Sequence, residues 1–197
     1  MKIILGFWDL FQKKKTDDTN DESHDNDEAS EELVFAKNFT EAGGKFIYID
    51  KGDSVIDTFT KIKEENQWDK NNVKCLSPAL SKNLGIKKTN DIAENDDLKA
   101  LVIECEYLLS NTGRILISSN QIKNNKIDSL PDILIVIATS NQFVGDVSEG
   151  MTKLKSKYSK KFPMNITTIN VKNKFIEDDF LSYGKNAKDI YLIISDE

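Results

Sequence analysis

Two kinds of hydrophobic pattern alternate along residues 33–197. Continuous apolar runs predict buried strands at 46–49, 73–76, 101–105, 115–117, 133–139, 166–169 and 190–194. Apolar residues that recur every three or four positions predict helices at 33–42, 53–65, 78–84 and 147–158. The polar stretch 86–99 is expected to be a loop. Continuous rather than alternating apolar strands are typical of a sheet that is covered on both faces. The pattern therefore predicts an α/β fold with a three-layer, mainly parallel sheet.

Several residues mark where these helices begin and end. Asp53 or Ser54 is expected to cap the helix at 53–65. Gly85 is expected to end the helix at 78–84. Asp146 and Glu149 have the spacing of a capping box at the start of the last helix.

The first 31 residues form a separate region. Apolar residues at helical spacing predict a short amphipathic segment over 1–15, which ends with the lysines at 13–15. It either docks on its own domain or frays, or it rests on a membrane or a partner. Residues 16–31 are acidic and poor in large apolar side chains, which predicts a disordered linker. The folded domain is then expected to span 32–197.

Charge is distributed unevenly along the chain. Residues 1–32 hold four lysines and ten acidic residues, which accounts for the whole net charge of −6, and the remainder is neutral. No basic stretch with interleaved aromatic residues is present, so we do not expect nucleic-acid binding. The longest apolar run, 133–138, is far shorter than the roughly 20 residues that cross a bilayer. With no secretory signal, the sequence predicts a cytoplasmic protein.

Few residues are available for metal or cofactor chemistry. The chain has one histidine, His24, and two cysteines, Cys75 and Cys105, which are 30 residues apart. Zinc and iron–sulfur sites need several such ligands at close spacing, so we expect no metal. No glycine-rich nucleotide-binding motif is present, and no cofactor is expected.

The most unusual local chemistry follows the strand at 101–105. Glu104 and Glu106 lie where this strand ends, and open α/β sheets bind ligands at the carboxyl ends of their strands. Two neighbouring carboxylates are candidates for an acid and base, or for a nucleophile.

A tight turn with a positive charge comes shortly afterwards. Thr112 and the backbone of Gly113 are candidate donors to a small anion, and Arg114, the only arginine, is a candidate clamp for a carboxylate or phosphate. Alternatively, Arg114 pairs with Glu104 or Glu106, and the Thr-Gly dipeptide forms a hairpin turn.

The stretch 105–116 resembles the Thr-Gly segment of LUD-domain proteins, the lactate-utilization protein B/C family. Supporting segments occur in family order at 39–44, 130–136, 142–144 and 184–194. The lead-in at 11–15 is similar to that of short stand-alone family members from Bacteroidetes-type bacteria. The resemblance implies a fold like that of the sugar-phosphate isomerase and CoA-transferase group.

The resemblance also implies a function and partners. It links the chain to an L-lactate oxidation system whose other subunits carry iron–sulfur clusters, and those subunits are the expected protein partners. It places Gly184 and Lys185, and Lys188 with them, near the Thr112–Arg114 turn in one cleft for a small organic anion or a sugar phosphate.

The sequence departs from the family pattern at three places. Asn111–Arg114 replaces Glu-Thr-Gly-Thr/Ser, and the stretches 171–178 and 184–188 replace small-residue segments with lysine- and asparagine-rich ones. Two hypotheses follow. The first is an accessory or regulatory subunit, without a cluster, that keeps an anion pocket. The second is an enzyme of the isomerase and CoA-transferase type that uses Glu104 or Glu106 as base or nucleophile.

Overall fold

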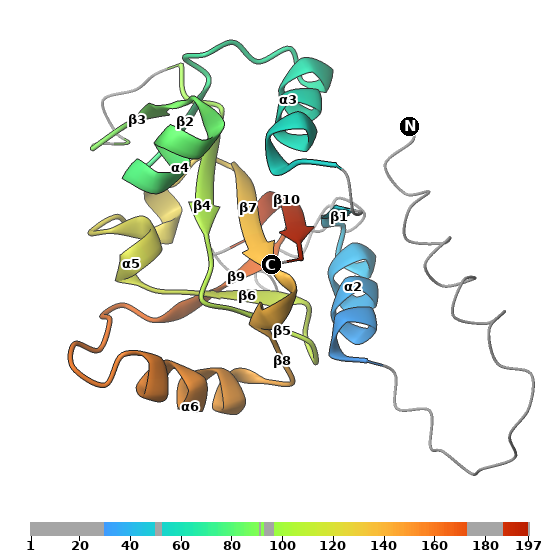
Figure 1. The fold of residues 1–197 in the computed structure, drawn as a ribbon, viewed down its shortest axis with the longest axis vertical. Helices are drawn as coiled ribbons and strands as arrows, with labels where there is room; N and C mark the ends of the chain where they lie inside the picture. The colour runs from blue at the N-terminus through green and yellow to red at the C-terminus, as the bar shows by residue number, and fades with distance from the viewer. Residues whose placement is uncertain (1–29, 50–52, 91, 93–96, 173–186, 197) are drawn as a thin grey trace, which may run out of the picture.

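The fold is a mainly parallel sheet with helices on both faces (Figure 1). The structure, a computed structural model, describes residues 30–49, 53–90, 92, 97–172 and 187–196. The helices are α2 (Glu31–Glu41), α3 (Val55–Glu65), α4 (Pro78–Leu84), α5 (Ser119–Ile122) and α6 (Val147–Lys157), with 3₁₀ turns η1 (Ile127–Ser129) and η2 (Ser140–Gln142). The strands are β1 (Lys45–Ile49), β2 (Val73–Cys75), β3 (Lys87–Lys88), β4 (Ala100–Glu104), β5 (Tyr107–Leu109), β6 (Arg114–Ile117), β7 (Ile133–Thr139), β8 (Phe143–Val144), β9 (Thr167–Val171) and β10 (Ala187–Ser195).

The strand order is β3-β2-β4-β7-β10-β9-β6-β5-β8, and β1 also pairs with β10. All pairs are parallel except β5–β6 and β6–β9. The predicted α/β class with a three-layer, mainly parallel sheet is therefore confirmed. The antiparallel part is the hairpin β5–β6, which turns the chain back beside β9.

The core lies on both faces of the sheet because successive strand residues point to opposite sides. On one face, Ile103 and Val136 pack with Phe35 and Phe39 of α2. On the other, residues of β4, β7 and β10 pack with Phe59 and Ile62 of α3 and with Leu80 and Leu84 of α4. A third, smaller cluster joins α6 to the β5–β6 hairpin.

The helix ends follow the predicted residues. Ser54, rather than Asp53, caps α3 by accepting a 3.1 Å hydrogen bond from the backbone N–H of Asp57. Gly85 ends α4 with a φ of +64°. Asp146 caps α6 by accepting a 2.9 Å bond from the N–H of Glu149.

Some expectations need correction. The stretch 86–99 was expected to be a loop, yet Lys87–Lys88 pair with β2 as strand β3. The short elements β5, α5, η1, η2 and β8 were not predicted. Helix α2 begins at Glu31, one residue before the expected boundary of the domain. The other expectations for 1–15 and 16–31 fall on residues 1–29, outside the described residues. In the described part, no helix is long and apolar enough to cross a membrane.

Candidate functional site

A polar cavity of about 600 Å³ opens at the carboxyl ends of β4 and β7. These strands run parallel with Glu104 opposite Ile137, so the last residues of both reach the same edge of the sheet. This is the edge at which open α/β sheets place ligands. The lining residues are Glu104, Cys105, Asn120, Gln121, Ile137, Ala138, Thr139, Gln142, Lys157 and Tyr158.

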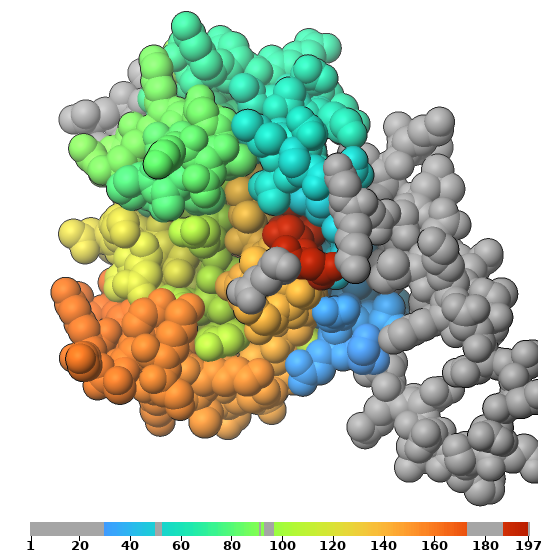
Figure 2. Space-filling model, in the orientation of Figure 1, coloured from blue at the N-terminus to red at the C-terminus, as the bar shows by residue number. Residues whose placement is uncertain are grey.

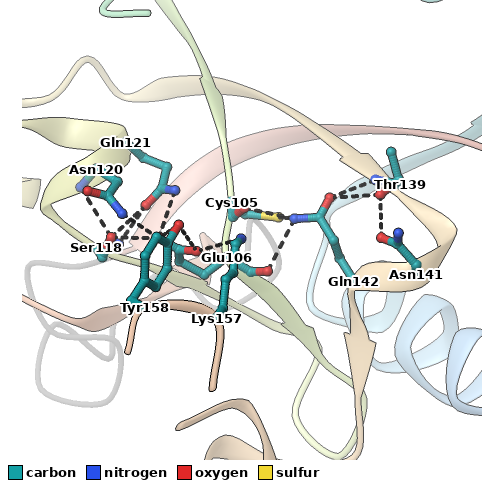
Figure 3. A network of polar contacts seen from close by, with 10 residues as sticks. All are labelled: Cys105, Glu106, Ser118, Asn120, Gln121, Thr139, Asn141, Gln142, Lys157 and Tyr158. Atoms are coloured by element: carbon teal, nitrogen blue, oxygen red, sulfur yellow. Dashed lines mark hydrogen bonds and ion pairs between the residues drawn. The ribbon is translucent and has the colours of Figure 1, made fainter. Parts of the chain in front are cut away.

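A buried carboxylate organises one wall of this cavity (Figure 3). The Glu106 side chain has no exposed surface, and five side chains donate hydrogen bonds to it. The donors are Ser118 (2.8 Å), Asn120 (3.3 Å), Gln121 (3.1 Å), Lys157 (3.2 Å) and Tyr158 (3.0 Å). They come from the end of β6, from α5 and from the end of α6, so this one carboxylate ties three segments together.

The pKa of Glu106 lies below its ordinary value. Burial by itself raises this pKa, but the hydrogen bonds from Ser118 and Gln121 and the charge of Lys157 outweigh it. Glu106 is therefore ionised at neutral pH, and its oxygens are already occupied by donors. Such a carboxylate is a poor base and serves to hold the Lys157 and Tyr158 side chains in place.

Lys157 carries a positive charge to the cavity. Burial lowers the pKa of Lys157. The charge of Glu106 and the hydrogen bond to it raise the pKa by more, so the net shift is upward. Its side chain is 48% exposed, and its ammonium group has donors beyond the one that Glu106 accepts. Lys157 can therefore bind an anionic group of a ligand in the cavity.

Gln142 fixes the bend between β4 and β5, from which Glu106 projects. Its amide nitrogen donates to the carbonyl oxygens of Cys105 (2.8 Å) and Glu106 (3.2 Å). Its amide oxygen accepts from the N–H of Thr139 at 2.8 Å. One side chain thus joins the ends of β4 and β7 and sets the direction in which the carboxylate of Glu106 points.

Glu104 and Cys105, which also lie at this edge, differ in how far a ligand can reach them. Glu104 is exposed at the end of β4 and has no hydrogen-bond or ion-pair partner among the described residues. Its carboxylate is therefore open to a ligand. The thiol of Cys105 is 4% exposed, and burial and the neighbouring charge of Glu106 raise its pKa. Cys105 is thus a neutral part of the wall.

The Thr112–Arg114 turn lies at the other end of the β5–β6 hairpin. Arg114 is opposite Leu109, about 10 Å along the strand from Glu106. Among the described residues, the exposed Arg114 pairs with neither Glu104 nor Glu106, so the alternative of an Arg–Glu ion pair is wrong. Thr112 and Gly113 form the turn of the β5–β6 hairpin, as the alternative interpretation predicted. This turn packs on α2, where Asn38 donates a 2.8 Å hydrogen bond to the carbonyl oxygen of Ser110.

Lys188, near the last strand, does not join this cavity. Lys188 is the second residue of β10, and its Nζ donates to the carbonyl oxygen of Leu130 at 2.7 Å. Because Asp189 pairs with Ile133 at the start of β7, Lys188 lies at the amino end of the sheet, opposite the cavity. Lys188 therefore does not line this cavity, and its expected position in a cleft with the Thr112–Arg114 turn stays a prediction. Gly184 and Lys185 lie outside the described residues.

Sequence reasoning identified Glu104 and Glu106 but missed most of the cavity. Lys157 and Tyr158 were interpreted only as the outer face and apolar stripe of a helix. Ser118 and Gln121 were not singled out, although a serine followed three residues later by glutamine is a capping-box signal. Among the described residues, no group of three or more histidine, cysteine, aspartate or glutamate side chains is placed to hold a metal.

One comparison with known proteins identifies the family, and a second supports the fold. The family profile described as LUD domain matches residues 80–195. A search of solved structures found a DUF162 family protein from Deinococcus radiodurans with a TM-score of 0.58 and 15% identity. The match covers 86% of this chain and 99% of that one. No curated protein matched significantly. The profile spans more than half of the chain and covers the cavity-lining residues, and the protein therefore belongs to the LUD-domain family.

Proposed function

We propose that this LUD-domain protein binds a small monoanionic hydroxy acid, of the lactate type, in the cavity between β4 and β7. In this proposal it is an accessory or regulatory subunit of lactate or organic-acid utilization and works with iron–sulfur subunits. The link to lactate comes from the family, and the choice of ligand comes from the cavity. The observation that carries the proposal is that Lys157 and the open carboxylate of Glu104 both line one cavity.

The two charged groups complement the two functional groups of a hydroxy acid. The ammonium group of Lys157 binds the ligand carboxylate, and the carboxylate of Glu104 accepts a hydrogen bond from the ligand hydroxyl. The cavity volume falls within the range of small-molecule sites, and the side chains of Asn120 and Thr139 offer further polar contacts.

The local charge also selects among anions. Glu104 and Glu106 are negative and Lys157 is positive, so these three groups sum to −1. This net negative charge repels a ligand with two or three negative charges more strongly than a ligand with a single carboxylate. We therefore expect L-lactate to bind more tightly than phosphate, malate or a sugar phosphate.

Isothermal titration calorimetry of L-lactate tests this proposal. Removing the charge-assisted bond in Lys157→Gln should weaken binding by roughly 10- to 150-fold. Lys82→Gln is the control, because Lys82 is exposed on α4 and does not line the cavity. Arg114→Ala should bind as wild type. Absence of binding in wild type, or loss of binding in Arg114→Ala alone, would contradict the proposal. Circular dichroism of each variant checks that it is folded.

An enzyme of the isomerase and CoA-transferase type is the second candidate. It is favoured by the contrast between Glu104, which is open to the cavity, and Glu106, which is saturated with donors. Glu104 is then the base that removes a proton next to a ligand carbonyl. Proton NMR of pyruvate or a sugar phosphate in D₂O tests this, since a base exchanges that proton for deuterium. Exchange in wild type and none in Glu104→Gln, with binding retained, would favour the enzyme over the accessory subunit.

A further inference from the structure

We infer that the acidic segment at residues 17–28 docks on a lysine-rich surface at the end of α6, beside the mouth of the cavity. We call this the lysine surface. It consists of the five exposed lysines between residues 153 and 161, namely Lys153, Lys155, Lys157, Lys160 and Lys161. Figure 2 shows the region of α6, in orange, as an outer surface of the molecule.

The lysine surface carries charge that the folded domain does not neutralise. Lys153 pairs with Glu149 at 2.8 Å and Lys157 with Glu106 at 3.2 Å. Lys155, Lys160 and Lys161 have no carboxylate within 4 Å among the described residues. Three like charges remain within seven residues, and an anionic partner there relieves their mutual repulsion.

The acidic segment joins the domain near the start of α6, on the side of Lys153, the first lysine of this surface. Helix α2 starts at Glu31, whose Oε1 lies 3.5 Å from the point that a Cβ on Gly145 would occupy, just before α6. The pKa of Lys153 is raised, mainly by its hydrogen bond with Glu149 and in part by the charge of Glu31. Figure 1 shows the same arrangement, with the start of α2 near the connection between β8 and α6. The segment is thus tethered at the near end of the lysine surface.

Charge and length both suit the docking. Residues 17–28 hold seven carboxylates and no lysine or arginine; the carboxylates are Asp17, Asp18, Asp21, Glu22, Asp25, Asp27 and Glu28. Fully extended, the fourteen residues 17–30 span at most about 50 Å. Helix α6 is only about 16 Å long. The acids therefore reach every lysine of the surface, and the tether gives them an effective concentration in the millimolar range.

Docking has a consequence for the cavity, and this consequence rests on the proposed function. Lys157 belongs to both the lysine surface and the cavity lining. Carboxylates of the segment that approach Lys157 compete there with the carboxylate of a ligand. The acidic segment then acts as an internal competitor that lowers the affinity for small anions.

Paramagnetic relaxation in the full-length protein tests the docking. A nitroxide on Ser23→Cys leaves the native thiols unlabelled, because Cys75 and Cys105 are buried. At low salt, the amide signals of residues 153–161 should lose at least half of their intensity, and high salt should restore it. Lys155→Gln/Lys160→Gln/Lys161→Gln should abolish the loss. The matched control is Lys61→Gln/Lys70→Gln/Lys82→Gln, which removes as many exposed lysines elsewhere and should retain the loss.

Several outcomes would overturn the inference. Unchanged signals over 153–161, or broadening that is equal over the whole surface, would show that the segment does not dock there. Phe162 and Met164, next to the lysines, are 42% and 70% exposed, so a membrane is the rival occupant. Binding of phosphatidylserine vesicles through these lysines, without broadening at α6, would assign the surface to lipid. None of these readouts uses lactate, so they remain decisive even if lactate does not bind.

Competition is measured separately by calorimetry. Replacing the seven acids by their amides should tighten L-lactate binding several-fold, provided that wild type binds it. Unchanged affinity together with clear broadening would overturn the competition while leaving the docking in place.

Discussion

Gly113 is the residue whose substitution most sharply tests the role of the Thr-Gly turn. In the structure this turn packs the β5–β6 hairpin against α2 rather than lining the cavity. Gly113 has a φ of +64°, and a Cβ there would lie 2.5 Å from the backbone nitrogen of Phe39 and 2.7 Å from the carbonyl carbon of Asn38. We therefore predict that Gly113→Ala strongly destabilises the fold.

Two costs add up in this variant. A side chain in the left-handed region costs about 1–2 kcal/mol. The close contacts involve the backbone of α2, which cannot rotate aside as a flexible side chain would, and overpacking of this kind costs about 1–3 kcal/mol. The free energy of unfolding should therefore fall by about 2–5 kcal/mol.

Gly85 provides the matched control. It has the same φ of +64°, but nothing lies within 4 Å of its added Cβ. Gly85→Ala should therefore cost only the backbone term, about 1–2 kcal/mol. Urea denaturation followed by circular dichroism measures both variants. Equal destabilisation of the two would refute the close packing of the turn on α2.

Three further predictions concern the cavity. Because the folded-state pKa of Glu106 is lowered, its contribution to stability is present at neutral pH and is lost as the pH falls below about 5. In urea denaturation from pH 7 to 3, the free energy of unfolding should therefore depend less on pH in Glu106→Gln than in wild type. Gln142→Ala leaves the N–H of Thr139 and the carbonyl oxygen of Cys105 without their partner and should cost about 1–3 kcal/mol in the same assay; no loss would show that the bend holds without this side chain. Cys75 and Cys105 are buried and their pKa values are raised, so neither should react with Ellman's reagent until urea unfolds the chain; rapid reaction of the native protein would contradict their burial.

Local patterns were enough to predict most of the sheet. Runs such as 133–138 are apolar at every position, so their burial on both faces can be inferred without tertiary information. The caps at Ser54 and Gly85 also depend on neighbouring residues alone. Strands β3 and β8 have two residues each, and no periodicity can show in so short a segment.

The site was harder to predict because its residues are far apart in the chain. Glu104 and Glu106 follow a strand end, which is a local signal. Lys157 lies 51 residues after Glu106, and its contact with that carboxylate depends on how α6 packs against the hairpin. From the sequence it is one of many lysines on helix surfaces. Arg114 shows the opposite error: it is near the acids in sequence, but the hairpin carries it away from them.

The ligand cavity is the central claim, and amide chemical shifts during an L-lactate titration of the full-length protein test it most directly. The account predicts that the largest shifts occur at the carboxyl edge of the sheet, around Glu104, Asn120, Thr139 and Lys157, while Thr112–Arg114 stay unchanged. Shifts confined to Thr112–Arg114, or none at saturating lactate, would contradict it.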